Sequence, residues 1–516
     1  MSGSPFSESA PSVAEANENS ASLTKSALQG VAWNYSGIGV LIVVQVASTV
    51  ATARLIAPAW FGVYAAAQAA SGLAAYFTFA TVGLAVLRRS KLGEKTVGSA
   101  IVITLVANTL VLVGLWFLAS AWAQAWNIPA AARLIRVLAF ALFFNSLAMV
   151  PLALTRRRLR FGASALVETS TQVSGITVGV VLAVFLHTTM ALAIGQVVGS
   201  VTLFIGAAAL ARRDLRLGFD RGEARELLTY GGQLSGLYFS AWAINAIPSW
   251  FTSLSFGKFT LGLYNRASLV VNLPLSYLTG GITKVLFPLY GRVRDDIVKT
   301  KAMLSEGIVL ATGFIWPLFA IVAGAAPVLV DILLGQRWHG AAPLLRLFVL
   351  IACGVFPTTF LTNAAEALGW IKFAAFRLLV LLALLGAAVA IVGVTGLGLR
   401  WLLVGVAIAQ WLTYVVTIRP FVSRGIVNSR LVLGSHLVHG SLSLAAFGAA
   451  FGCAELLADA GLFAQALGEV VLTLAVCALV LRGRRWYPAT RVLAERMSGD
   501  TFESGLLARL RVIVLG

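Results

Sequence analysis

The chain has little negative charge and few cysteines or histidines. Of its 516 residues only 20 are Asp or Glu, against 39 Lys or Arg, and it contains 3 cysteines and 4 histidines. Cys353, Cys453 and Cys477 are odd in number and all lie inside apolar runs, which predicts buried thiols and argues against a disulfide or metal framework.

The usual catalytic patterns are also missing from the sequence. It has no nucleophile elbow, no glycine-rich phosphate loop before a helix and no pair of catalytic carboxylates. His436 and His439 lie three residues apart, but a third metal ligand is not evident, so packing explains them better. We therefore expect neither an enzyme nor a bound cofactor or metal.

Polar sequence is scarce as well: 11% of the residues are charged, 59% are hydrophobic, and the mean hydropathy is +0.89. A soluble domain of this composition would have too little polar surface. Apolar runs of about 20 or more residues recur between residues 27 and 481, and each is long enough to cross a hydrocarbon core of ~30 Å. The runs are too long and too continuously apolar for barrel strands, so they predict an all-α polytopic membrane protein.

We expect fourteen membrane spans. Two prolines, Pro317 and Pro327, lie near the end of the ninth, and residues 328–334 are expected to form a re-entrant or interfacial turn. The predicted limits are 27–53, 61–87, 98–122, 132–155, 163–187, 189–211, 228–254, 260–290, 302–323, 341–366, 371–394, 399–421, 430–456 and 461–481.

Positive charge alternates between the loops. The loops after even-numbered spans hold most of the Lys and Arg, for example Arg156, Arg157 and Arg158 in one and Arg212 and Arg213 in the next. By the positive-inside rule these loops are cytoplasmic, which predicts that both termini are cytoplasmic. Topology therefore accounts for the net charge of +19 without a nucleic-acid partner.

Residues 1–24 are rich in Ser, Ala and Glu without aliphatic periodicity, which predicts a disordered cytoplasmic tail. Residues 482–516 form a basic cytoplasmic tail that is either an amphipathic helix on the inner leaflet or a solvated segment. Between the tails we expect an N-lobe over 25–225, a C-lobe over 226–425, and two appended spans over 426–481.

The two lobes are predicted from an internal repeat. Thr52, Gly62, Tyr64 and Ala67 match Thr252, Gly262, Tyr264 and Ala267 at one constant offset of 200 residues, and further matches follow at offsets that drift to 212. Six spans separate the equivalent positions, which indicates a parallel repeat about an axis along the membrane normal, with a cavity between the lobes. Chance similarity among apolar segments is the alternative.

Three cations are candidates for a binding site within the membrane. Arg266 and Lys284 are eighteen residues apart in the predicted eighth span, so they share one helix face about 27 Å apart, and Tyr277 lies on the same face. Arg54 ends the first span. These side chains either attract an anionic head group in a cavity or snorkel to the membrane surfaces.

Polar side chains in the first and seventh spans suggest a path for a sugar. Asn34 and Gln45 belong to a polar face of the first span, and Gln233 and Asn245 belong to the seventh span, its partner in the repeat. The alternative is that these amides join helices to one another. No Asp or Glu occurs in the first three spans, which counts against a cation-coupled antiporter that needs a deep carboxylate.

Three segments resemble the polysaccharide transporter family, the O-antigen and exopolysaccharide flippases of the MATE-like superfamily. They are ARLIAPAWFGVYA at 53–65, LGLYNRASLVVNLPLSYLTGGITKVLFPLYGRVRDD at 261–296, and RWHGAAPLLRLF at 337–348. The resemblance covers roughly residues 25–425. It implies a two-lobed helical protein of the bacterial plasma membrane that moves a polyprenyl-pyrophosphate-linked oligosaccharide to the outer leaflet by alternating access.

We therefore predict a flippase whose partners are its lipid-linked oligosaccharide, membrane lipids and, through the tails, glycan-assembly enzymes. Coupling to Na⁺ or H⁺ is left open. One alternative is a cation-coupled multidrug antiporter of the same superfamily. Another is a membrane glycan polymerase or ligase, which the short outer loops disfavour, and a third is a scaffold of a glycan-assembly complex.

Overall fold

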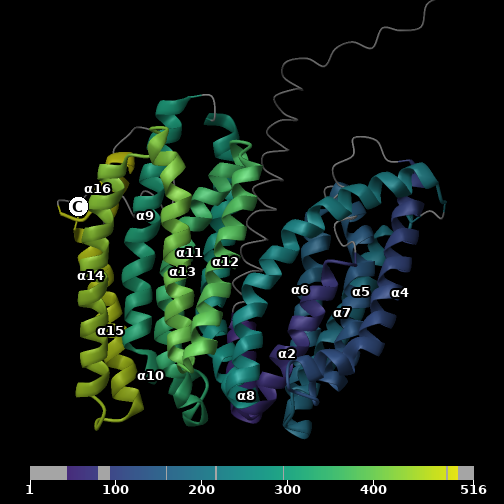
Figure 1. Ribbon diagram of the computed structural model, residues 1–516, viewed down its shortest axis with the longest axis horizontal. Helices are drawn as coiled ribbons and strands as arrows, with labels where there is room; N and C mark the ends of the chain where they lie inside the picture. The colour runs from purple at the N-terminus through teal and green to yellow at the C-terminus, as the bar shows by residue number, and fades with distance from the viewer. Residues whose placement is uncertain are drawn as a thin grey trace, which may run out of the picture. The chain divides into compact units, whose positions relative to one another are not determined.

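The computed structural model describes residues 43–78, 93–158, 160–215, 218–293, 296–483 and 486–497. These residues form helices and contain no strand, so the predicted all-α membrane protein is confirmed (Figure 1). Ten of the described helices are long and apolar enough to cross a membrane, whereas the predicted number of fourteen spans is not confirmed.

The chain divides into two compact units. These units do not test the predicted lobe limits, which remain a prediction. Unit 1 comprises Met1–Ala51, Ala74–Trp116 and Arg136–Leu234, and unit 2 comprises Thr52–Leu73, Phe117–Ile135 and Ser235–Gly516. The helices that cover residues 94–125, 131–157 and 221–293 are thus each divided between the two units.

Most of unit 1 consists of long helices packed through small residues. Gly175 and Gly179 on one helix face Gly195 and Gly199 on the next so closely that a Cβ on Gly195 would collide with the Gly175 carbonyl oxygen. The helices are α4 (Glu94–Ala125), α5 (Ala131–Arg157), α6 (Phe161–Leu186), α7 (Met190–Ala211) and the start of α8 (Arg221–Val293), after an apolar helix at Val43–Leu55.

Unit 2 continues α8 and adds the remaining helices. The α8 helix is broken at Gly257, whose φ of 77° suits a residue without a Cβ, so it forms two helices joined by a turn. The others are α2 (Pro58–Ala75), α9 (Ile297–Gly324), α10 (Ala326–Leu333), the 3₁₀ helix η1 (Gln336–Ala341), α11 (Ala342–Ala367), α12 (Ile371–Thr395), α13 (Leu399–Ser423), α14 (Ser429–Leu456), α15 (Leu462–Arg482) and α16 (Pro488–Met497).

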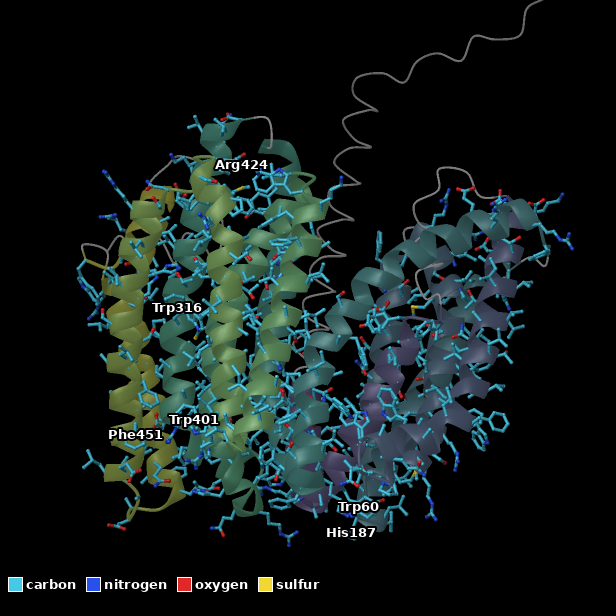
Figure 2. The ribbon with its side chains drawn as sticks, in the orientation of Figure 1. Trp60, His187, Trp316, Trp401, Arg424 and Phe451 are labelled. Atoms are coloured by element: carbon cyan, nitrogen blue, oxygen red, sulfur yellow. The ribbon has the colours of Figure 1, made fainter. Side chains whose placement is uncertain are left out.

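Aromatic and basic side chains mark the two ends of α13. Trp401 lies in its first turn and is exposed, and Arg424 caps its other end with the guanidinium carbon 4.2 Å from the centre of the Trp370 ring (Figure 2). Exposed tryptophan near a helix end and arginine at the basic end are typical of a membrane-spanning helix.

An aspartate in one of the basic loops caps the helix that follows it. Asp296 accepts hydrogen bonds from the backbone N–H groups of Val298 and Lys299 at the start of α9, and it forms an ion pair with Lys299 at 3.1 Å. The hydrogen bond from the Lys299 backbone and those beside it lower the pKa of Asp296 below its ordinary value. The carboxylate therefore stays charged and fits the positive N-terminus of the helix.

The α2 helix crosses α8 at equivalent positions of the predicted repeat. A Cβ on Gly62 would collide with the carbonyl oxygen of Lys258, and a Cβ on Gly262 would collide with that of Pro58. Pro58 and Lys258 are themselves 200 residues apart, as are the two glycines. The contact is thus reciprocal, as at an interface related by a twofold axis, which supports the duplication over chance similarity.

Alanine at either glycine of this crossing should destabilise the protein, because the colliding atoms belong to the backbone of the opposite helix. We expect Gly62→Ala and Gly262→Ala each to lower the free energy of unfolding by about 1–3 kcal/mol. Thermal unfolding of the purified protein in detergent measures this.

Gly114→Ala is the matched control, since no atom lies within 4 Å of a Cβ there. It should leave the unfolding temperature unchanged or raise it, because alanine favours a helix over glycine. Equal effects at all three glycines would contradict the crossing.

Candidate functional site

Arg266 is a buried cation in the second half of α8. Its side chain is 6% exposed, and its guanidinium carbon lies 3.7 Å from the centre of the Phe61 ring. Its Nε–H has no hydrogen-bond partner within the part of the chain that the structure describes. A buried charge is costly unless it is paired, and a ring face compensates for only part of that cost, about 2 kcal/mol.

The ring beneath Arg266 is held rigidly. Phe61 lies in the first turn of α2 and is fully buried, with the Trp338 ring centre 5.3 Å from its own. Trp338 belongs to η1, and its indole N–H donates to the carbonyl oxygen of Ala53 at 2.9 Å. Residues far apart in the sequence thus form one aromatic platform for the guanidinium.

A polar pair borders the platform. Gln68 donates from Nε2 to the Tyr64 hydroxyl at 2.7 Å, and the hydroxyl lies near enough to Arg266 to interact with its charge. The repeat partner of Tyr64 is used differently, because Tyr264 packs edge-on against Phe348 with ring centres 4.9 Å apart. A cation, an amide and a hydroxyl therefore lie together on one side of the repeat only.

Arg266 has no basic counterpart in the first copy of the repeat. The residue 200 positions earlier is Ala66, which is fully buried and whose carbonyl oxygen accepts a hydrogen bond from the Trp122 indole at 3.1 Å. The two copies share the glycine crossing, but only the second places a positive charge beside it.

The other predicted site residues are placed differently. Arg54 is exposed, and its Nη2 donates to the carbonyl oxygen of Ile332 on α10 at 3.0 Å. Asn245 is exposed and donates to Ala241 in its own helix at 3.0 Å. Tyr277 is 37% exposed, about 16 Å along α8 from Arg266.

Four more predicted positions add nothing to the geometry around Arg266. Gln45 is half-buried in unit 1. The side chains of Lys284 and Gln233, and all of Asn34, lie outside the described residues. The cationic ladder of Arg266 and Lys284 therefore stays a prediction, whereas the burial of Arg266 favours a charge held within protein over one that snorkels.

The charge pattern of the sequence did not indicate Phe61, Tyr64 or Trp338 as site residues. Aromatic residues in apolar runs ordinarily indicate packing, so periodicity gave no reason to select them. A different signal was present: the three segments quoted for the family resemblance contain Phe61 and Tyr64, Arg266, and Trp338 respectively. The structure brings those three segments together at one place.

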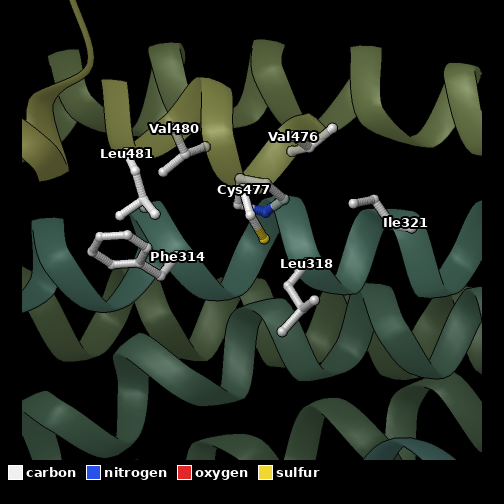
Figure 3. Close-up of a pocket in the computed structure, with 9 residues that line it drawn as sticks. Phe314, Leu318, Ile321, Val476, Cys477, Val480 and Leu481 are labelled. Atoms are coloured by element: carbon white, nitrogen blue, oxygen red, sulfur yellow. The ribbon is translucent and has the colours of Figure 1, made fainter. Parts of the chain in front are cut away.

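An apolar cavity between α9 and α15 offers no second anion site. It has a volume of about 140 Å³ and is lined by residues such as Phe314, Leu318, Val476 and Cys477, none of them charged (Figure 3). In the described part of the chain no group of three His, Cys, Asp or Glu side chains is arranged to hold a metal ion.

Replacing Arg266 should separate a structural role from a binding role. We expect Arg266→Met to leave the unfolding temperature unchanged or to raise it, because the variant removes a buried charge whose Nε–H lacks a partner. Thermal unfolding in detergent is the measurement, and Arg424→Met, at an exposed cation on the Trp370 ring, is the control. A loss of more than about 2 kcal/mol for Arg266→Met would show that the fold needs the charge.

Two sequence relatives indicate the family. The lipopolysaccharide biosynthesis protein WzxC of Escherichia coli (strain K12) is 22% identical over 405 residues, which cover 77% of this chain and 82% of that protein. The succinoglycan biosynthesis transport protein ExoT of Rhizobium meliloti (strain 1021) is 23% identical over 299 residues, 58% of this chain and 60% of that protein.

Solved structures share the fold. The lipid II flippase MurJ in an inward closed conformation has a TM-score of 0.70 at 12% identity, covering 87% of this chain and 98% of that one. An inward-facing multidrug resistance MATE family transporter of the MOP superfamily has a TM-score of 0.59 at 14% identity, covering 76% and 95%. Likeness at such identities concerns the fold alone.

The family profile described as "Polysaccharide biosynthesis protein" matches residues 51–343, more than half of the chain and the part that contains Phe61, Arg266 and Trp338. The chain therefore belongs to this family of polysaccharide biosynthesis proteins, and it shares the fold of MurJ and the MATE transporter.

Proposed function

We propose that this protein moves a polyprenyl-pyrophosphate-linked oligosaccharide from the inner to the outer leaflet for cell-surface polysaccharide synthesis. The observation that carries the proposal is the buried guanidinium of Arg266, whose Nε–H has no partner among the described residues. A buried arginine with an unpaired N–H can bind an anion, since its planar donors match the oxygens of a phosphate.

Burial makes the charge effective. A pyrophosphate brought to Arg266 exchanges its hydration for a guanidinium in a region of low dielectric, where the attraction is much stronger than in water. The Phe61 ring stacks on the guanidinium and stabilises it in this position. Tyr64 and Gln68 add a hydroxyl and an amide that suit phosphate or sugar oxygens.

Transport follows from alternating access. The head group binds while the site is open to the cytoplasm, the two repeats rock about their common axis, and the site then opens to the outside. The polyprenyl chain remains in lipid throughout, because its transfer to a polar cavity would be unfavourable. On this proposal both termini are cytoplasmic, the chain is a transporter and not an enzyme, and glycan-assembly enzymes are its neighbours.

The energy source is either an ion gradient or removal of the product. For proton coupling, the described residues offer Glu469 on α15, which is 7% exposed and has no hydrogen-bond partner for either carboxylate oxygen. The carboxylates of unit 1 near its basic edge are less suitable, since Glu168 is paired with Arg156 and Asp214 with Arg158.

Transport by Arg266 variants tests the proposal. We expect Arg266→Ala to abolish complementation of a bacterial strain that lacks its own flippase for the same glycan. Arg266→Lys should retain partial activity, because lysine keeps the charge but loses the fork of donors. Arg419→Ala, at an exposed arginine of α13, is the control and should complement fully.

Membrane levels of each variant are measured by immunoblot, so that loss of protein is not mistaken for loss of transport. Full complementation by Arg266→Ala, or by the double variant Arg266→Ala with Lys284→Ala, would overturn the assignment of the site. Drug resistance on overexpression without any effect on the glycan would favour the antiporter.

A further inference from the structure

Unit 1 contains an apolar cavity whose lining includes none of the residues proposed to bind the oligosaccharide lipid. Its volume is about 300 Å³, at the lower end of the range of ~300–1,000 Å³ for ligand pockets. Residues of α4, α5 and α7 line it, followed by Leu215: Ile101, Thr104, Leu105, Leu147, Val150, Pro151, Phe204 and Ala208. The lining suits a hydrocarbon chain, and the exposed side chain of Leu105 shows that the cavity reaches the outer surface of unit 1.

Positive charge lies at one end of this cavity. Phe204 and Ala208 are four residues apart on one face of α7, and Arg212 lies four residues further on, in helical conformation at the end of the helix. Arg212 therefore continues the lining face about 6 Å beyond Ala208. Both Arg212 and its neighbour Arg213 are exposed.

Two of the acids near this edge are paired with other arginines. Glu168 is paired with Arg156, and Asp214 is paired with Arg158, so each acid neutralises a different arginine. No ion pair joins Arg212 or Arg213 to any residue that the structure describes. The edge thus keeps a net positive charge directly beside an apolar cavity.

The lining of the cavity has almost no polar surface. Thr104 is the one lining residue with a polar side chain, but its hydroxyl oxygen is buried within the protein and does not face the cavity. A ligand in the cavity therefore meets hydrocarbon, and its polar groups must lie at the end that carries Arg212.

We propose that this cavity binds an acyl chain of an anionic phospholipid from the cytoplasmic leaflet, with the phosphate on Arg212 and Arg213. The basic side of the chain is the cytoplasmic side by the positive-inside rule, where anionic head groups and basic residues between helices attract one another. The order of groups along the site, two arginines and then an apolar cavity, matches the order within the lipid, a phosphate and then hydrocarbon.

The dimensions favour a phospholipid over the tail of a polyprenyl substrate. The lining positions on each helix extend over about one turn, or ~6 Å, so the cavity takes only the part of a chain next to its head group. This site is also separate from Arg266, which belongs to unit 2.

Native mass spectrometry of the purified full-length protein tests the proposal. After delipidation the protein is titrated with phosphatidylglycerol and with phosphatidylcholine that carry the same acyl chains. One phosphatidylglycerol should bind more tightly than phosphatidylcholine, and each of Arg212→Gln and Arg213→Gln should weaken it about fivefold. Arg419→Gln, an exposed arginine on α13 in unit 2, should have no effect.

A second variant tests the cavity itself. Ala208→Phe fills it, so binding of phosphatidylglycerol should fall at least about tenfold while Arg212 and Arg213 are retained. Should that variant fail to fold, the two arginine variants alone decide.

Three results would overturn the proposal. The first is equal binding of the two phospholipids, and the second is unchanged phosphatidylglycerol binding in the folded arginine variants. The third is complete displacement of phosphatidylglycerol by an equal concentration of polyprenyl phosphate, which would assign the cavity to the substrate tail. Since none of these readouts measures transport, they are independent of the outcome for Arg266.

Discussion

The close approach of α2 and α8 at Gly62 and Gly262 is the constraint on which the site depends. Any larger side chain at either position would collide with backbone of the opposite helix and move the helices apart. Phe61 is the neighbour of Gly62, and Arg266 lies one turn after Gly262, so the crossing itself brings the ring beneath the guanidinium. The low dielectric at this depth then strengthens attraction to an anion far beyond what a surface arginine provides.

The repeat gives a nearly symmetric frame, and the chemistry placed on it is asymmetric. Each copy contributes a glycine and a tyrosine at equivalent positions, but Arg266 corresponds to Ala66, and Tyr264 packs on Phe348 while Tyr64 borders the cation. A duplicated frame allows two halves to move in a related way. Arg266 is a buried cation one turn beyond Gly262, whereas the equivalent position in the first copy is the buried, uncharged Ala66.

The sequence predicted most helix limits within a few residues, because hydropathy and glycine or proline breaks act locally. The gap expected between residues 254 and 260 contains the Gly257 break, and the turn expected at 328–334 is the short helix α10, Ala326–Leu333. The site was harder to predict. Phe61 and Trp338 are ordinary apolar residues by composition, and only their presence in segments that resemble a family marked them.

The sequence by itself determined that the chain is a helical membrane protein and where most of its helices run, and it indicated a duplication that the reciprocal glycine contact then supported. These properties depend on the chain's average polarity and on spacing, which neighbouring residues set. The tertiary structure decided that Arg266 is buried on a ring while Arg54 is exposed and bound to the α10 backbone. Both are arginines near the end of an apolar run, and their difference arises from partners such as Phe61 and Ile332, about 200 or more residues away, whose positions only packing fixes.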